Sequence, residues 1–178
     1  MKLNLRKKNK GFTLVEILLV VGFIALASIG IYAVYNKAIT TGKANQENTN
    51  LQTIRAGINN LFGNQKDYAD VSEDVVRNAR ISPPSMHTGA YALTNLFGGR
   101  VIIREETIGV KKGFSIESQR VPTDVCIKLG AMAGASFERI QIASAIVKEP
   151  GYKPDPEKIV VQCSEDDMSY VNMKFYSY

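Results

Sequence analysis

The chain has 178 residues, of which 45% are hydrophobic and 22% charged, so it is long enough for one domain with a sizeable core. Its 22 basic and 17 acidic residues give a formal charge of +5, and five of the basic residues lie in residues 1–11, which hold no acid. Subtracting those five leaves 17 basic against 17 acidic residues, which excludes a basic nucleic-acid-binding face spread over the fold.

An apolar segment follows the basic tail. Residues 12–35 contain one charged residue, Glu16, and residues 17–35 are a run of 19 uncharged residues. As a helix with a rise of about 1.5 Å per residue, this run spans roughly 28 Å, which matches the hydrocarbon core of a bilayer. Because five cations precede the segment, the positive-inside rule predicts that residues 1–11 are cytoplasmic and that residues 36–178 form a domain outside the membrane.

Two simpler interpretations of the apolar segment stay open. A cleaved secretory signal would end at a small-residue site after an apolar stretch of roughly 7–15 residues. This stretch is longer and runs into Tyr32, Tyr35, Asn36 and Lys37. A plain membrane anchor explains the length and the charge but not Glu16, because a carboxylate inside a bilayer costs on the order of 3 kcal/mol.

Glu16 gains a partner if the chain is cut between Gly11 and Phe12. The cut exposes a new α-amino group on Phe12, and Glu16 lies four residues later on the same helix face. Its carboxylate can then pair with the terminal ammonium group of a neighbouring copy. Such a pair would fix the axial offset between two packed helices, since any other offset leaves a charge unpaired in an apolar environment.

Residues 10–16, KGFTLVE, and the apolar helix after them resemble the processing site of type IV pilins and the related pseudopilins. The resemblance implies that a prepilin peptidase cleaves after Gly11 and methylates the new amine of Phe12, and that Glu16 directs assembly. It also implies a helical homo-oligomeric filament without a cofactor, built at the inner membrane from a single-pass precursor with a cytoplasmic N-terminus. The further partners implied are an assembly ATPase, a platform protein and an outer-membrane secretin, and no nucleic acid is required.

A single long helix is predicted for residues 12–62, because no proline occurs before Pro83. Residues 36–50 are polar, and an apolar stripe at helical spacing then begins. The stripe consists of Leu51, Ile54, Ile58, Leu61 and Phe62. We therefore expect a helix that is apolar all round in its first half and packs one face on a globular head in its second, ending at Gly63. Four glycines lie in this helix: Gly22, Gly30, Gly42 and Gly57. Each permits close helix packing, marks a point where the helix loosens in a filament, or is merely tolerated.

The rest of the chain is predicted to form short helices and strands, which makes the fold α+β. Helices are expected after Ser72, which reads as an N-cap, and from a Thr123–Asp124 cap through Leu129. Strands are expected over residues 101–104, 114–118, 138–144 and 170–176, the first two flanking a turn at residues 109–113. The family resemblance implies the type IV pilin fold, in which the long helix packs on an antiparallel sheet and the head carries one disulfide.

Residues 156–163 carry conflicting signals. Asp155 followed by Pro156 is typical of the start of a helix. The β-branched run Ile159–Val161 favours a strand instead. The family resemblance favours the helix.

Cys126 and Cys163 allow one disulfide at most, and everything after Tyr35 is expected in a compartment where disulfides persist. Closing the 36-residue interval between them would stabilise the head by roughly 4 kcal/mol on the chain-entropy model. Two buried free thiols are the alternative, and similar pilins carry one bridge in this region.

The remaining polar residues give no pattern that is typical of a catalytic or binding site. His87 has no partner motif and is interpreted as a loop residue. Residues 165–167, EDD, offer oxygens for Ca²⁺, although a solvated turn is the simpler interpretation. Glu105–Glu106 and Lys111–Lys112 are expected to pair across the hairpin. No nucleophile, base and oxyanion donors can be assembled from the sequence, so neither an enzyme nor a catalytic or metal site is predicted.

The middle of the chain favours the type IVb subclass, near the bundle-forming pilins. The features are Asp67–Tyr68, residues 95–99 before a strand, and Cys126 on a short helix. The 11-residue leader is short for that subclass, and Phe12 is the first mature residue usual in type IVa. The predicted function is a major pilin of a bacterial pilus used in adhesion, aggregation or conjugation. Alternatives are a type II secretion pseudopilin, a minor tip pilin and, in another class, a membrane-anchored periplasmic binding module.

Overall fold

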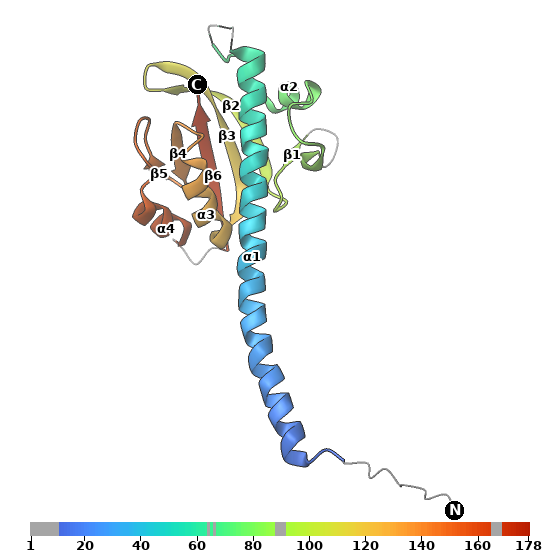
Figure 1. Cartoon of the computed structure of the whole chain (residues 1–178). Coiled ribbons are helices and arrows are strands. Elements are labelled where there is room, and N and C mark those ends of the chain that lie inside the picture. Colours follow the sequence, from blue (N-terminus) through green and yellow to red (C-terminus); the bar gives the residue numbers. More distant parts are fainter. Residues whose placement is uncertain (1–10, 64, 66, 88–91, 165–168) are drawn as a thin grey trace, which may run out of the picture. The chain divides into compact units, whose positions relative to one another are not determined.

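The computed structural model describes residues 11–178 with the exception of residues 64, 66, 88–91 and 165–168. The chain consists of two compact units that divide between Ile39 and Thr40. Helix α1 (Leu14–Phe62) runs through both, and the elements that follow it belong to the second unit, which we call the head (Figure 1).

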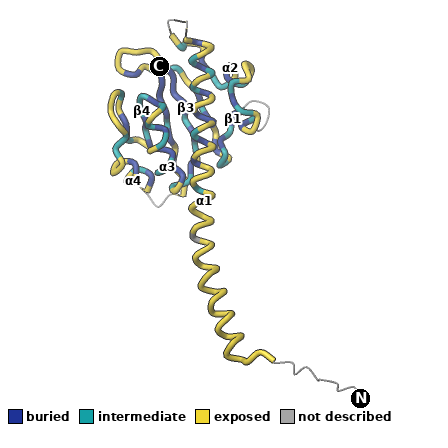
Figure 2. The backbone as a smooth tube through the Cα atoms, in the orientation of Figure 1, coloured by how far each residue is buried: buried dark blue, intermediate teal, exposed yellow. Residues whose placement is uncertain are grey.

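In the first unit, α1 carries apolar residues on all sides. Every described side chain from Phe12 to Ile39 is exposed, and Figure 2 shows this stretch in yellow. In the described part of the chain, α1 is the one helix long and apolar enough to cross a membrane. An apolar surface of this extent needs lipid or other protein chains to cover it.

In the head, α1 packs one stripe of side chains on the core. The buried residues of this stripe are Ala44, Leu51, Ile54, Ile58 and Phe62. The sequence predicts Leu61 in the same stripe, but its side chain is 45% exposed. The reason is geometric, because Leu61 lies about 100° around the helix from Phe62.

The described strands of the head form one antiparallel sheet in the order β1-β2-β3-β6-β4-β5. The strands are β1 (Leu93–Thr94), β2 (Arg100–Ile108), β3 (Lys111–Pro122), β4 (Arg139–Ile142), β5 (Ala145–Lys148) and β6 (Tyr170–Ser177). The last strand, β6, lies between β3 and β4, where Phe175 pairs with Ile116 on one side and with Ile140 on the other. The end of the chain therefore completes the middle of the sheet.

The hairpin of β2 and β3 is tighter than the sequence predicts. Gly109 and Val110 alone join the two strands, and residues 111–113 belong to β3 rather than to the turn. Gly109 has φ +65°, a conformation that glycine adopts without strain and that two-residue hairpin turns require.

Three described α-helices accompany the sheet: α2 (Glu73–Asn78), α3 (Thr123–Ala133) and α4 (Pro156–Ser164). The predicted N-cap of α2 is confirmed, since Ser72 Oγ accepts a 3.4 Å hydrogen bond from Val75 N. The predicted cap of α3 is wrong. Thr123 is already the first helical residue, and Pro122 at the N-cap position has no side-chain hydrogen bond to offer.

The conflict over residues 156–163 is resolved in favour of a helix. Asp155 Oδ1 accepts hydrogen bonds from the backbone N atoms of Glu157 at 3.1 Å and Lys158 at 3.2 Å, so it caps α4. Within the β-branched run, Ile159 is buried while Val160 and Val161 are about half exposed. The capping hydrogen bonds and one buried side chain per turn thus outweigh the strand propensity.

The sequence does not predict β5 or the short 3₁₀ helix Pro84–Met86. Strand β5 lies at the edge of the sheet, and its Val147 O accepts a hydrogen bond from Asp155 N at 2.9 Å. Gly130 of α3 lies beside Ile142 of β4 and Ile159 of α4. Helices α3 and α4 therefore cover the face of the sheet that carries the Ile142 side chain. The core of the head is therefore on this one face.

Candidate assembly site

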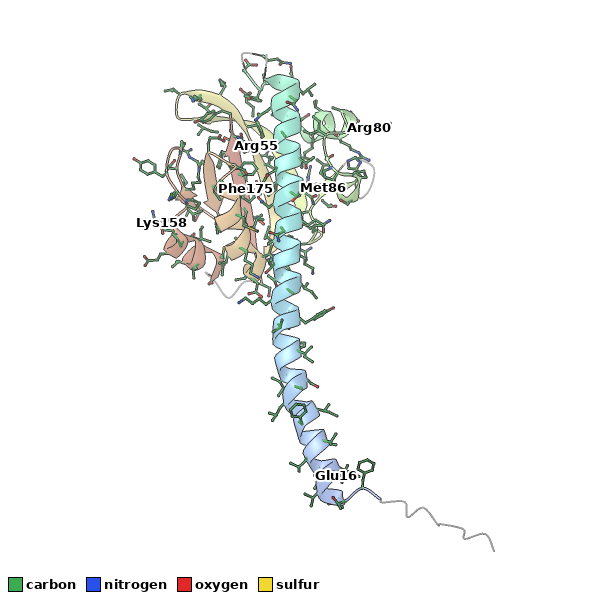
Figure 3. All side chains as sticks on the ribbon, in the orientation of Figure 1. Glu16, Arg55, Arg80, Met86, Lys158 and Phe175 are labelled. Carbon is green, nitrogen blue, oxygen red and sulfur yellow. A yellow bond between two sulfur atoms is a disulfide. The ribbon has the colours of Figure 1, made fainter. Side chains whose placement is uncertain are left out.

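The predicted assembly glutamate lies in the first turn of α1 (Figure 3). Thr13, which the sequence analysis did not single out, begins this turn, since its Oγ1 accepts a 3.3 Å hydrogen bond from Glu16 N and its backbone O accepts one from Ile17 N at 3.2 Å. Gly11 and Phe12 precede the helix. A carboxylate in the first helical turn is favoured by the helix dipole, and it lies one turn from the Phe12 backbone.

The surroundings of Glu16 are apolar. Its side chain shares a hollow of about 220 Å³ with Phe12, Ile17, Val20 and Val21. Within residues 11–178 as described, no ion pair neutralises its carboxylate. Residues 12–35 therefore present one carboxylate on a largely apolar surface, which suits a cation that comes from another molecule.

Cys126 on α3 and Cys163 on α4 form the predicted disulfide, with their Cα atoms 5.9 Å apart. Both residues are fully buried. The bridge links the two helices that cover the sheet beside α1, and its loop contains β4 and β5. It therefore constrains a loop that contains two strands rather than a single turn.

A buried polar network joins α1 to the sheet, and its centre is Glu47. Glu47 Oε1 accepts a 3.1 Å hydrogen bond from Ser118 Oγ, and Oε2 accepts a 3.4 Å bond from Leu96 N. Burial raises the pKa of the Glu47 carboxyl, while the hydrogen bonds from Leu96, Ser118 and Asn50 oppose that rise. Glu47 is not among the residues predicted to face the core, although its place three residues after the buried Ala44 and four before Leu51 marks it as inward-facing.

Asn95 extends this network into the turn before β2. Its Nδ2 donates to Gln119 O at 2.6 Å and to Ser118 Oγ at 2.9 Å, and its Oδ1 accepts from Gly99 N at 2.8 Å. The turn at residues 95–99, noted in the sequence as a family feature, is thereby held against β3.

Ion pairs at the β2–β3 hairpin differ in part from the prediction. Lys112 Nζ lies 3.0 Å from Glu105 Oε1, as expected across the hairpin. Glu106 instead pairs with Lys174 of β6, and Lys111 Nζ lies 4.0 Å from the centre of the Tyr178 ring. The contacts of Glu106 and Lys111 link the hairpin to β6 and to the residue that follows it.

The remaining candidate residues do not form a reactive site. His87 pairs with Leu93 in a β-bridge, and its Nε2 shares a 2.8 Å hydrogen bond with Ser82 Oγ, so it is a structural residue with a partner that the sequence did not reveal. The acidic run 165–167 lies outside the described residues. In the described part of the chain, no group of three or more His, Cys, Asp or Glu residues could hold a metal ion.

Known proteins resemble this chain in sequence. A family model described as "PilS N terminal" matches residues 41–174. The major structural subunits of the bundle-forming pilus from Escherichia coli O127:H6 (strain E2348/69 / EPEC) and O111:H- are each 22% identical over 128 residues. The match covers 71% of this chain and 66% of each relative, so the chain spans just under two thirds of the length of these curated relatives.

Solved structures resemble the chain in fold. The crystal structure of a type IVb pilin from Salmonella typhi gives a TM-score of 0.58 at 21% identity and covers 74% of this chain and 97% of that one. TcpA, a type IV pilin from Vibrio cholerae El Tor biotype, gives 0.55 at 13% identity and covers 77% and 99%. The predicted pilin fold is thus confirmed, and, because the family model spans most of the sequence, the chain belongs to the PilS family of type IV pilins.

Proposed function

We propose that this pilin is the structural subunit of a bacterial type IV pilus, formed when residues 12–35 of many copies pack into a helical core. Residues 1–11 act as a leader that a prepilin peptidase removes, and residues 36–178 provide the part of the subunit that faces outward. Glu16 sets the axial offset between neighbours by pairing with the methylated amine of Phe12 on another copy.

One observation supports this proposal above all. The described side chains from Phe12 to Ile39 are all exposed and almost all apolar, and they include one acid without an ion-pair partner in the described chain. A bilayer can cover such a surface, but its hydrocarbon interior offers the carboxylate no cation. A bundle of identical helices covers the same surface and supplies one amine for each carboxylate.

The proposal also sets the location and partners of the protein. The precursor lies in the inner membrane with its N-terminus in the cytoplasm, as the cations of residues 1–11 favour, and the mature subunit ends in an extracellular filament. An assembly ATPase, a platform protein and a secretin drive and guide this transfer. Similarity to major structural subunits favours the role of an abundant subunit, used for adhesion, aggregation or conjugation.

Mass spectrometry of the protein from sheared surface material tests the processing step. We expect a mature chain that starts at N-methylated Phe12 and lacks residues 1–11, with Cys126 and Cys163 oxidised. An intact leader on protein that stays in the membrane fraction would contradict the filament and support a membrane-anchored binding module instead. Gly11→Ala should block processing, whereas Lys10→Arg, which keeps the charge next to the cut, should not.

A further inference from the structure

An exposed valine at the tip of the β2–β3 hairpin has no role within its own head. Val110 is 99% exposed. The turn geometry depends on Gly109, whose φ is +65°, so the second turn position needs no apolar side chain. Polar residues are the usual choice at such a position. A fully exposed β-branched side chain there lowers no energy in the single head, which raises the question of what it contacts.

An apolar groove lies between α3, α4 and the loop before α4. Its volume is about 610 Å³, and its apolar lining includes Ile127, Ala131, Tyr152, Pro154, Ile159 and Val160. Tyr152 is 75% exposed and Val160 48% exposed. Lys148 also lines the groove, but its ammonium group donates to Phe137 O at 2.6 Å and to Glu138 O at 3.0 Å. An apolar side chain that enters the groove therefore leaves the hydrogen bonds of the Lys148 ammonium group intact.

The valine and the groove are well separated within one head. Lys148 of the groove pairs with Ile140, and Phe175 pairs with both Ile140 and Ile116, so the groove lies level with the middle of β3 and three strands away from it. Ile116 is about 20 Å along β3 from Val110 at roughly 3.3 Å per residue, and three strand spacings add roughly 14 Å across the sheet. Val110 therefore cannot reach the groove of its own head.

We propose that the Val110 turn of one head inserts into the groove between α3 and α4 of another copy in the filament. Two different surfaces meet in such a contact, so it is heterologous, and it repeats from copy to copy without closing into a dimer. This is the kind of contact that a helical polymer needs. The inference rests on the proposed filament and adds a specific contact between heads to the packing of the N-terminal helices.

The charges near the Val110 turn and the groove have only a small effect on this contact. Lys111 and Lys112 follow the valine, and the exposed Glu157 lies in the first turn of α4 next to Pro156 of the groove. Lys153 also lines the groove, so the net charge of the groove is not strongly negative. Lys112 already pairs with Glu105, and Lys111 lies over the Tyr178 ring. The burial of Val110 is therefore the main favourable term.

The small surface area buried in this contact implies that it forms only within the filament. A two-residue turn in a groove of about 610 Å³ buries far less than the roughly 1,200 Å² of total surface that stable complexes bury. Free subunits in detergent should therefore not dimerise through it. In a filament the helices hold the heads at high effective concentration, and the same small contact then repeats along the whole polymer.

Cross-linking tests the contact directly. We expect purified filaments with Val110→Cys and Val160→Cys in the same chain to form ladders of cross-linked subunits with a short bis-maleimide. The matched control pairs Val110→Cys with Val161→Cys, because Val161 is similarly exposed, at 53%, but does not line the groove. Equal ladders from both pairs, or none from the first pair, would overturn the proposal.

Accessibility and assembly give a second test. The thiol introduced by Val160→Cys should react with a maleimide at least tenfold more slowly in filaments than in detergent-solubilised subunits, and Val110→Asp should restore most of that reactivity. Val110→Asp and Val160→Asp should each lower the shear resistance of filaments several-fold, whereas Val161→Asp should not. Protection that persists with Val110→Asp would mean that another segment or ligand fills the groove, and it would refute the assignment.

The two failures are distinguishable. If wild-type protein forms filaments but these tests fail, the head contact is wrong and the filament stands. If the wild-type protein is never found in filaments, the proposed function itself is wrong.

Discussion

The Glu47 carboxylate on α1 accepts a 3.1 Å hydrogen bond from the hydroxyl of Ser118 on β3, and both residues are fully buried. No ion pair neutralises Glu47 in the described part of the chain. The link between the helix and the sheet is therefore a hydrogen-bonded acid in an apolar environment, and its strength depends on pH.

The first prediction concerns this pH dependence. Burial raises the pKa of Glu47 above its ordinary value of about 4.5, so the folded state binds the proton more tightly than the unfolded chain. The contribution of Glu47 to the free energy of unfolding should therefore be largest below pH 4.5. This contribution should fall as the pH rises from 4.5 through the raised pKa, and it should stay constant at higher pH.

Urea denaturation of the mature chain in detergent across this pH range measures the effect. Glu47→Gln should flatten the pH dependence, since an amide keeps an acceptor for Ser118 without the charge. Glu105→Gln serves as the control, because Glu105 is partly exposed and should have little influence. A pH profile that Glu47→Gln leaves unchanged would rule out this account of the network.

The second prediction concerns the Cys126–Cys163 disulfide. Reduction should lower the free energy of unfolding of the mature chain by roughly 4 kcal/mol, because the 37-residue separation closes a large loop of the unfolded chain. Denaturant midpoints with and without dithiothreitol measure this loss. The double variant Cys126→Ala/Cys163→Ala should match the reduced wild type and show no response to the reductant, and a response from it would point to a different target.

The third prediction compares two glycines of α1 within the head. A Cβ atom on Gly57 would lie 2.1 Å from Ile81 Cγ2, whereas one on Gly42 would meet no other atom within 4 Å. Gly57→Ala should therefore destabilise the head by about 1–3 kcal/mol through overpacking. Gly42→Ala should stabilise it by up to about 1 kcal/mol through helix propensity. Thermal unfolding by circular dichroism should separate the two variants, and equal shifts would contradict the packing of Ile81 on α1.

Local signals in the sequence predict much of this fold. The KGFTLVE motif at residues 10–16 carries the family resemblance, and the side-chain caps Ser72 and Asp155 mark the starts of α2 and α4. Of the roles that the sequence leaves open for these glycines, close packing holds for Gly57 beside Ile81 and not for Gly42, which has open space around it in this chain. Such features succeed because each depends on residues that are near in sequence or on one helix face.

Features that depend on strand order are missed for a physical reason. Glu106 and Lys174 pair although 68 residues separate them, because β6 returns to the middle of the sheet, and no local pattern specifies that position. Glu47 is missed because its polar neighbours in residues 36–50 hide a buried position. Strand β5 has only four residues and lies at the sheet edge, where a short apolar run carries little signal.

The most direct test of the central claim is electron microscopy of sheared surface material from cells that express Glu16→Ala in place of the wild type. We expect processed subunits that start at Phe12 to accumulate in the inner membrane while filaments are lost. Val20→Ala, one turn further along the same surface, should still assemble because it changes no charge. Filaments of normal number and length from Glu16→Ala would contradict the role of the glutamate in assembly.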